Sequence, residues 1–171
     1  NRAEKNESGE GGFGGAVNLN LTNNLFANCI FLNNTAEAWG GAIAGLGFRD
    51  PEGGDIPNLV RVRNCTFTGN TAGTTGGAIL SNMDRFSIRN TIMWGNTPDE
   101  FSETLSETEI IYTLIQGGYA GTGNIDADPM FVNAAAVNLR LRPGSPAIDS
   151  GTAEFAPQMD ILCVMRPQFA D

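Results

Sequence analysis

The sequence predicts an all-β fold of the parallel β-helix (solenoid) class. Three observations predict it: a repeated motif, a nearly constant repeat length, and short alternating segments in place of helices. Within the 171 residues, a Gly-Gly-Ala-aliphatic tetrad begins at Gly14, Gly40 and Gly76, and an Asn-small-x-large-x-x-Asn motif spans 28–34, 64–70 and 90–96. A unit this short cannot bury its own apolar face, so the copies must stack on one another.

The spacing of the repeats defines the coils. Gly14 and Gly40 lie 26 residues apart, whereas Gly40 and Gly76 lie 36 apart. One coil therefore carries an insertion of about ten residues, which a surface loop accommodates at little cost. The segment 45–57, rich in Gly, Pro, Asp and Glu, is the expected insertion.

The remaining chain completes a solenoid of about four to five coils. Residues 110–117 repeat the pattern of 88–95 as a fourth, degenerate coil. The expected organisation is a polar lead-in over 1–12, coils over 13–121, and a C-terminal coil and cap-like segment over 122–171. The lead-in runs straight into the first tetrad, which suggests truncation upstream. The cap would wrap Leu139, Leu141 and Ile148 onto the last coil.

The segments inside each repeat favour strands. Alternating, β-branched stretches such as 59–63 and 85–89 fit the two-residue period of a strand. Gly, at 22 residues, disfavours helices throughout. The Leu-x-x-Leu-x-Leu pattern of leucine-rich repeats is absent. We expect three short strands per coil: the tetrad, a segment like 60–62 and a segment like 65–67.

Equivalent positions of neighbouring coils are expected to form columns. An Asn at the corner between the second and third strands tolerates left-handed backbone angles, and its amide can bond the equivalent Asn one coil away. Such a row of bonded amides would consist of Asn28, Asn64 and Asn90. A column of small residues would contain Cys29, Cys65 and Thr91, and a column of large ones Phe31, Phe67 and Met93. The cysteines of the column are expected to be buried thiols, because parallel Cβ vectors aim the sulfurs poorly for a disulfide.

Two signatures resemble known bacterial proteins. The pairing of Gly-Gly-Ala-Ile with Phe-x-x-Asn, as at 31–34 and 67–70, resembles the repeats of chlamydial polymorphic outer-membrane proteins and related surface β-helices. Asp-Pro-Met-Phe at 128–131, followed by Arg-Pro-Gly-Ser-Pro-Ala-Ile-Asp-Ser-Gly at 142–151, is similar to the C-terminal segment of β-helix proteins of the "choice-of-anchor" type. The resemblance implies a right-handed, single-stranded, pectin lyase-like β-helix that is extracellular, periplasmic or attached to the surface of a bacterium.

Composition excludes several classes of function. The formal net charge is −9, with no His and a single Lys, which argues against nonspecific nucleic-acid binding. Without His, a Ser–His or Cys–His nucleophile system cannot form. The three Cys lack the spacing of a metal site, and no apolar run is long enough to span a membrane. We therefore predict no catalytic residue, no cofactor and no transmembrane segment.

Two groups of acidic residues are candidate functional features. Asp50, Glu52 and Asp55 of the insertion offer oxygen ligands for Ca²⁺, although acidic glycine-rich loops are commonly just soluble loops. The acidic run over 99–109 is expected to solvate a connection between coils.

A row of Arg residues is the best candidate contact surface. Arg63 and Arg89 occupy equivalent positions of adjacent coils, and with Arg61 they could cradle an acidic glycan. The competing interpretation is a set of solvated outward positions. Trp94 follows the inward Met93, so its ring is expected to face outward, where it could contact a sugar or a protein.

The pattern as a whole favours a non-catalytic extracellular or cell-surface protein with a structural, adhesive or assembly-subunit role. Its partners would be proteins, or a larger assembly, at the open end of the solenoid, because unpaired strand edges invite pairing. The alternative is a carbohydrate-binding or polysaccharide-degrading module of the pectate-lyase type with glycan partners. That alternative requires the Arg row and a group of carboxylates to share one groove.

Overall fold

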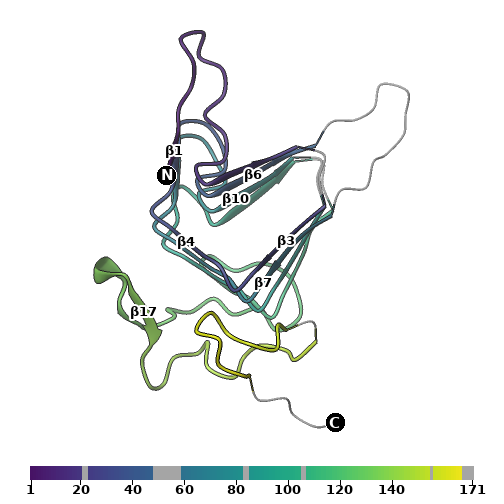
Figure 1. Ribbon diagram of the computed structural model, residues 1–171, viewed down its shortest axis with the longest axis vertical. Coiled ribbons are helices and arrows are strands. Elements are labelled where there is room, and N and C mark those ends of the chain that lie inside the picture. The colour runs from purple at the N-terminus through teal and green to yellow at the C-terminus, as the bar shows by residue number, and fades with distance from the viewer. Residues whose placement is uncertain (21–22, 48–58, 83–84, 105–106, 155, 167–171) are drawn as a thin grey trace.

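The protein is a right-handed parallel β-helix of four coils (Figure 1). The computed structural model describes residues 1–20, 23–47, 59–82, 85–104, 107–154 and 156–166. Figure 1 looks down the stack from its N-terminal end, and the chain winds clockwise as it recedes, which is the right-handed sense. The predicted fold class is confirmed. These residues contain no helix long and apolar enough to cross a membrane.

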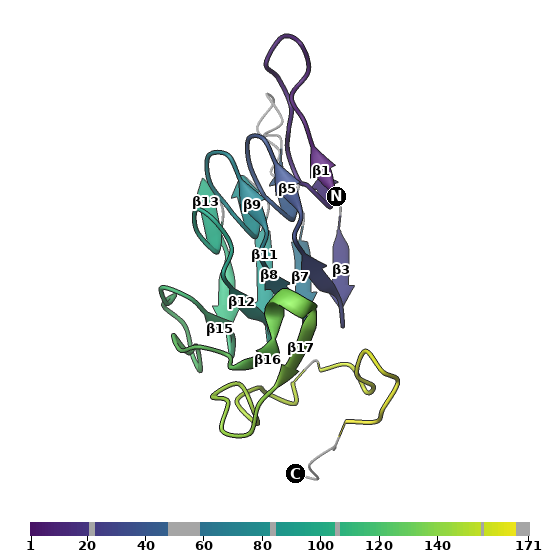
Figure 2. The same cartoon turned by 90° about the vertical axis from the view of Figure 1, so that its left-hand side faces the viewer.

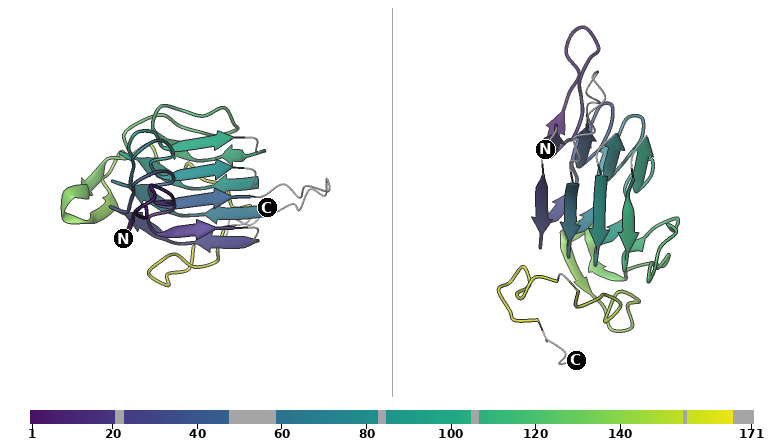
Figure 3. Two further views of the ribbon diagram at one scale, coloured as in Figure 1. Left: turned by 90° about the horizontal axis from the view of Figure 1, so that it is seen from above. Right: turned by 90° about the vertical axis from the view of Figure 1, so that its right-hand side faces the viewer.

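Each coil contributes one strand to each of three parallel, four-stranded sheets (Figures 2 and 3). Coil 1 contains β2 (Val17–Leu19), β3 (Asn24–Ala27), β4 (Ile30–Leu32) and the short β5 (Thr35–Ala36); coil 2 contains β6 (Ile43–Leu46), β7 (Leu59–Arg63), β8 (Thr66–Thr68) and the short β9 (Thr71–Ala72). Coil 3 contains β10 (Ile79–Asn82), β11 (Arg85–Arg89) and β12 (Ile92–Trp94); coil 4 contains β13 (Phe101–Thr104), β14 (Glu109–Ile111) and β15 (Leu114–Ile115).

A fourth, short sheet adds to the three strands per coil that the sequence predicts. It consists of β1 (Arg2–Ala3), β5 and β9, paired in parallel in that order. Strands of two residues are too short to show an alternating pattern, so periodicity does not reveal them.

The Gly-Gly tetrads form the corner before the first sheet, whereas the sequence suggested that they were part of its strands. β6 begins only at Ile43, after the Gly40–Gly41 pair. Gly40 has φ of +66°, and a Cβ on Gly41 would lie 2.1 Å from the carbonyl oxygen of Gly77 in the next coil. The first glycine of the pair therefore supplies a left-handed turn, and the second allows two coils to approach closely.

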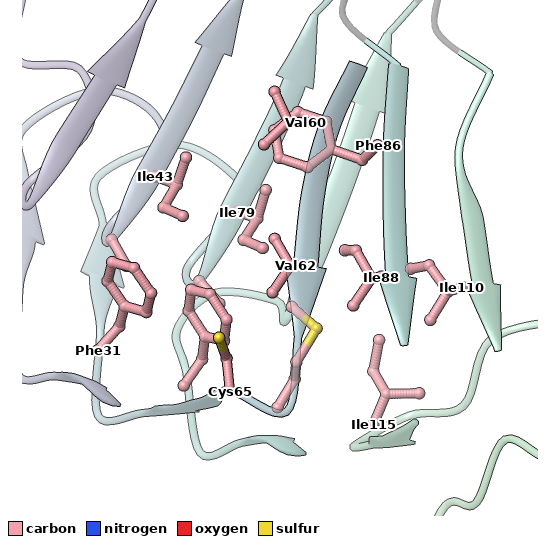
Figure 4. Close-up of a cluster of buried hydrophobic side chains, with 14 of the residues drawn as sticks. Phe31, Ile43, Val60, Val62, Cys65, Ile79, Phe86, Ile88, Ile110 and Ile115 are labelled. Atoms are coloured by element: carbon pink, nitrogen blue, oxygen red, sulfur yellow. The ribbon is translucent and has the colours of Figure 1, made fainter. Parts of the chain in front are cut away.

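The core consists of side-chain columns that run along the stack (Figure 4). Phe31 pairs in register with Phe67, and Phe67 with Met93. The rings of Phe31 and Phe67 stack with centroids 4.5 Å apart and an interplanar angle of 7°. From the second sheet, Val62 and Ile88 are also in register and fully buried. Each coil thus covers the apolar face of its neighbour, which a single coil could not do.

The expected insertion over 45–57 begins later than the sequence suggested. Gly45 is a buried residue of β6, which continues to Leu46. Residues 48–58 lie outside the described part of the chain, and β7 begins at Leu59.

The C-terminal region folds back along the outside of the stack. It first forms a hairpin of β16 (Phe131–Asn133), the 3-10 helix η1 (Ala134–Ala136) and β17 (Asn138–Leu141). Residues 147–154 and 156–166, which we call the strap, then follow the corner between the second and third sheets toward coil 1 (Figure 2). The strap meets coil 3 where Thr152 contacts Asn90, and it meets coil 1 where Met159 contacts Asn28.

The sequence suggested that the C-terminal region wraps Leu139, Leu141 and Ile148 onto the last coil. The structure differs from this expectation. Leu139 lines the same groove as Ile30 of coil 1, and 47% of Ile148 is exposed. The hydrogen bonds of the strap explain the difference, because the Asn side chains that hold it, Asn28 and Asn90, are spread along the solenoid corner.

Truncation of Phe67 should destabilise the fold strongly. The side chain is fully buried between Phe31 and Met93, so Phe67→Ala should lower the free energy of unfolding by about 3–5 kcal/mol. Chemical denaturation measures this loss. Leu25→Ala is the control, because Leu25 is 61% exposed and its loss should change stability by less than about 0.5 kcal/mol. Equal effects of the two changes would contradict the columns.

Candidate functional site

A ladder of buried Asn side chains runs along the corner before the fourth sheet. Its members, Asn34, Asn70 and Asn96, are the second Asn of each repeated motif, and we call them the Asn ladder. Asn34 Nδ2 donates to Asn70 Oδ1 at 2.8 Å, and Asn70 Nδ2 donates to Asn96 Oδ1 at 2.7 Å. The backbone N–H groups of Asn34 and Asn70 donate to the same two oxygens at 3.0 and 2.9 Å. Each amide is satisfied by the next coil, which permits its burial.

Two residues of different chemistry end the Asn ladder. At the N-terminal end, Asn1 Nδ2 donates to Asn34 Oδ1 at 3.1 Å. At the other end, the carboxyl group of Glu100 accepts the backbone N–H of Asn96 at 3.0 Å and also the Asn96 side-chain amide. An ionised carboxylate only accepts hydrogen bonds, so it closes a row of donors and offers none to a further coil.

Asp99 closes the glycine corner in the same way. Its Oδ1 accepts the backbone N–H groups of Gly76 and Gly77 at 2.6 and 3.1 Å, and its Oδ2 accepts the hydroxyl of Thr75 at 2.9 Å. The acidic run that the sequence assigned to a solvated connection thus begins with two capping carboxylates, those of Asp99 and Glu100.

Glu100 has the most strongly raised pKa of the carboxyl groups that the structure describes. Only 5% of the residue is exposed, and this burial raises its pKa to about 7, although the bonds from Asn96 act in the opposite direction. The end of the Asn ladder therefore changes its charge near neutral pH.

The structure corrects the amide ladder expected at Asn28, Asn64 and Asn90. All three adopt left-handed angles, with φ of 55°, 51° and 52°. However, Asn28 Nδ2 donates to Met159 C=O and Asn90 Nδ2 to Thr152 C=O, both at 2.8 Å. Asn64 Oδ1 is buried with no hydrogen-bond partner in the described part of the chain. Asn28 and Asn90 bond a segment outside the coil, so they hold the strap instead of each other.

The column of small residues has a common hydrogen bond. Cys29, Cys65 and Thr91 each donate to the carbonyl two residues earlier, at 3.3, 3.2 and 2.9 Å. The bond spans the left-handed Asn and closes the corner, which explains why Cys and Thr interchange there. All three cysteines are free thiols, and burial raises the pKa of Cys65 to about 12. Cys65 is therefore a structural donor and a poor nucleophile.

One member of the Arg row, Arg89, links coil 4 to the strap. Arg63 and Arg89 are in register, as the spacing predicts. Arg89 approaches Glu109 of coil 4 at 2.8 Å and Glu154 of the strap at 3.5 Å, and 14% of its side chain is exposed. Burial, together with the charges of Arg89 and Arg61, lowers the pKa of Arg63, and Glu154 acts against this shift. Arg89 therefore helps to hold the strap and is not a fully solvated side chain.

Trp94 and the acidic residues of the insertion are the remaining predicted contacts. Trp94 ends β12, is half-buried and pairs in register with Thr68. Asp50, Glu52 and Asp55 lie outside the described residues, so the Ca²⁺ hypothesis stays a prediction. Within the ranges that the structure describes, no three His, Cys, Asp or Glu side chains are grouped to hold a metal ion.

Two grooves separate the strap from the solenoid. The first, of about 590 Å³, lies beside coils 3 and 4 and is lined by Asn90, Tyr112 and strap residues 149–153. The second, of about 390 Å³, lies beside β4, the hairpin tip 137–140 and strap residues 160–162, and we call it the coil 1 groove. Arg166 lines both grooves.

Two segments of the chain match a family model. Residues 28–46 and 64–82 both match the Chlamydia polymorphic membrane protein repeat. Each match runs from an Asn corner, through an Asn ladder residue and a glycine corner, to the end of a first-sheet strand. No curated protein and no solved structure matches the chain. The chain thus carries repeats similar to those of a family of membrane proteins, and each matched segment covers the part of a turn from the third-sheet strand to the first-sheet strand of the next coil.

Sequence reasoning missed the Asn ladder and the anchors of the strap. The signal for the ladder was present, because the second Asn of the motif recurs as regularly as the first. For Arg166, whose Nη2 donates to Asn28 Oδ1 at 2.9 Å, no periodic signal exists, since the two residues are 138 positions apart.

Removal of one rung should show what the Asn ladder contributes. Asn70→Ala deprives the buried Asn34 amide of its acceptor, so we expect a loss of at least about 3 kcal/mol in the free energy of unfolding. Asn18→Ala, at an exposed position of β2, should leave stability nearly unchanged. Urea denaturation of both variants measures the difference, and similar losses would refute a special role of the ladder.

Glu100 should make stability fall as pH rises. Its pKa is about 7 when folded and near the ordinary 4.5 when unfolded, so between these values the folded state binds more protons. Relative to Glu100→Gln, the wild type should therefore lose up to about 3 kcal/mol of unfolding free energy from pH 4.5 to 7. The other carboxylates are common to both proteins, so the difference isolates Glu100. A difference that stays constant with pH would contradict a buried carboxyl group.

Proposed function

We propose that the protein is a non-catalytic β-helix of the bacterial cell surface, periplasm or extracellular space, with a structural, adhesive or assembly role. The observation that carries the proposal is the family match, because it falls on two successive turns of the solenoid. The matched family is one of membrane proteins, which supports a location at the bacterial envelope. The similarity of 128–131 and 142–151 to choice-of-anchor proteins points the same way.

The use of the polar side chains supports a non-catalytic role. Asn70 and Asn96 bond each other in the Asn ladder. Glu100 closes the end of the ladder, and Asp99 closes the glycine corner. The repeated residues thus hold the solenoid together. When the repeated residues of a protein stabilise its fold, its function is most simply carried by its surface and its strand edges.

The alternative role in carbohydrate binding or degradation has less support. It requires the Arg row to be available to an acidic glycan. Arg89 instead approaches Glu109 and Glu154, and the strap lies over this part of the corner. These two carboxylates offset the positive charge of Arg89, so the Arg row attracts an anionic glycan less strongly.

Surface labelling in the native bacterium tests the proposal. Intact cells are treated with a membrane-impermeant biotin reagent or with protease, and the protein is then detected with an antibody. We expect labelling or cleavage in intact cells, or recovery from the periplasm or the medium, while a cytoplasmic control protein stays protected. Recovery only with the cytoplasmic fraction would overturn the proposal.

A further inference from the structure

One connection between the fourth sheet and the glycine corner is longer than its counterparts. Residues 4–12, which we call the N-terminal loop, join β1 to Phe13, which bridges Trp39 of the next coil. At the equivalent place, the next two coils have only residues 37–38 and 73–74. The loop extends sideways beyond the outline of the coils, across the direction of stacking (Figures 1 and 2). The solenoid does not need these additional residues, and surface insertions of this kind commonly carry function.

The N-terminal loop ends in a turn that presents Asn6. The N–H of Asn6 donates to Glu10 C=O at 2.8 Å, and the N–H of Gly9 donates to Asn6 C=O at 2.9 Å. The side chain takes part through its Oδ1, which accepts the N–H of Glu10 at 2.9 Å. Residues 4–10 are all exposed. Asn6 Nδ2 donates to no other residue in the described ranges, so this amide nitrogen is open to solvent.

The turn carries an acceptor sequence for N-glycosylation. Residues 6–8 read Asn-Glu-Ser. Asn-x-Ser/Thr, with x other than Pro, is the sequence that an oligosaccharyltransferase modifies, and its acceptors lie on surface loops of exported proteins. Such a short motif also arises by chance, so its structural setting decides. Here Asn6 and Ser8 are both exposed on one projecting turn, which is the setting that the reaction needs.

Two other copies of the motif are built into the coils. The copy at 33–35 contains Asn34, a rung of the Asn ladder, and Thr35, which pairs with strands on both sides. The copy at 64–66 lies at the corner beside the strap, and its Cys65 is only 2% exposed. An enzyme cannot draw either segment into its active site without opening a coil. Only the copy in the N-terminal loop combines the motif with an accessible turn among these three.

We propose that Asn6 is an N-glycosylation site whose co-substrate is an oligosaccharide linked to a lipid pyrophosphate. The proposal rests on the location proposed above, because this transfer takes place outside the cytoplasm. A bond forms between Asn6 Nδ2 and C1 of the first sugar, and the bond from C1 to the pyrophosphate oxygen breaks. The lipid pyrophosphate leaves with the electron pair, and Nδ2 gives up one proton.

The turn can carry the glycan without a change of fold. The reaction replaces one hydrogen of Asn6 Nδ2 and leaves Oδ1 in place, so Oδ1 can still accept the N–H of Glu10. A glycan on the tip of a projecting loop extends into solvent. It would shield the N-terminal loop, because exposed loop tips are preferred sites of proteolytic cleavage.

Mass spectrometry of the protein from its native bacterium tests the proposal. We expect fragmentation of its proteolytic peptides to place a glycan on Asn6. Ser8→Ala should abolish the modification, because it destroys the motif and leaves Asn6 in place. Ser8→Thr and Glu7→Gln are the matched controls on the same turn, and both should retain the glycan because both keep the motif. These positions are fully exposed, so the variants should melt like the wild type.

The contrary outcomes are equally specific. An unmodified Asn6 in the wild type, or a glycan that persists on Asn6 in Ser8→Ala, would overturn the inference. So would a glycan that Asn6→Gln retains, since it would then sit on another atom such as the Ser8 hydroxyl, or a glycan found only at another Asn of the chain. Surface labelling reads out the proposed function separately: a labelled protein with an unmodified Asn6 would refute this inference alone.

Discussion

In-register stacking of the Asn ladder is the constraint on which the rest of the structure depends. A buried amide must find hydrogen-bond partners. Here Asn34 and Asn70 each donate to the ladder residue of the next coil, and Asn70 and Asn96 also donate to backbone carbonyls of the preceding coil. A coil that slipped by one residue would lose these bonds and would also turn its apolar side chains outward. The ladder therefore fixes the register in which Phe31 and Phe67 stack.

The same chemistry explains how the stack stops. Asn can continue a ladder because it both donates and accepts, whereas a carboxylate can only end one. Glu100 and Asp99 occupy the positions at which coil 4 would otherwise continue the Asn ladder and the glycine corner. The burial of Glu100 makes this ending dependent on pH. On the N-terminal side, the outermost rung of the Asn ladder is Asn34, whose Oδ1 accepts from the Asn1 amide.

The strap adds a second level of organisation. It crosses the coils along their left-handed corners, where Asn28 and Asn90 present amides to its backbone and Arg89 approaches Glu154. Because its contacts are spread over coils 1 to 3, the strap ties together repeats that otherwise touch only their neighbours. It also lines both grooves, so the segment that repeats least forms part of the wall of each.

The sequence by itself determined the features that repeat: the solenoid, the left-handed Asn corners and the columns of Phe31 and Cys29, whereas it gave the number of coils only as about four to five. Each of these is local and occurs several times, so spacing reveals it. Only the tertiary structure decided which Asn of each motif forms the ladder and where the strap lies. Both depend on side-chain direction and on contacts between residues far apart in the chain, such as Asn28 and Arg166, which occur once and leave no period in the sequence.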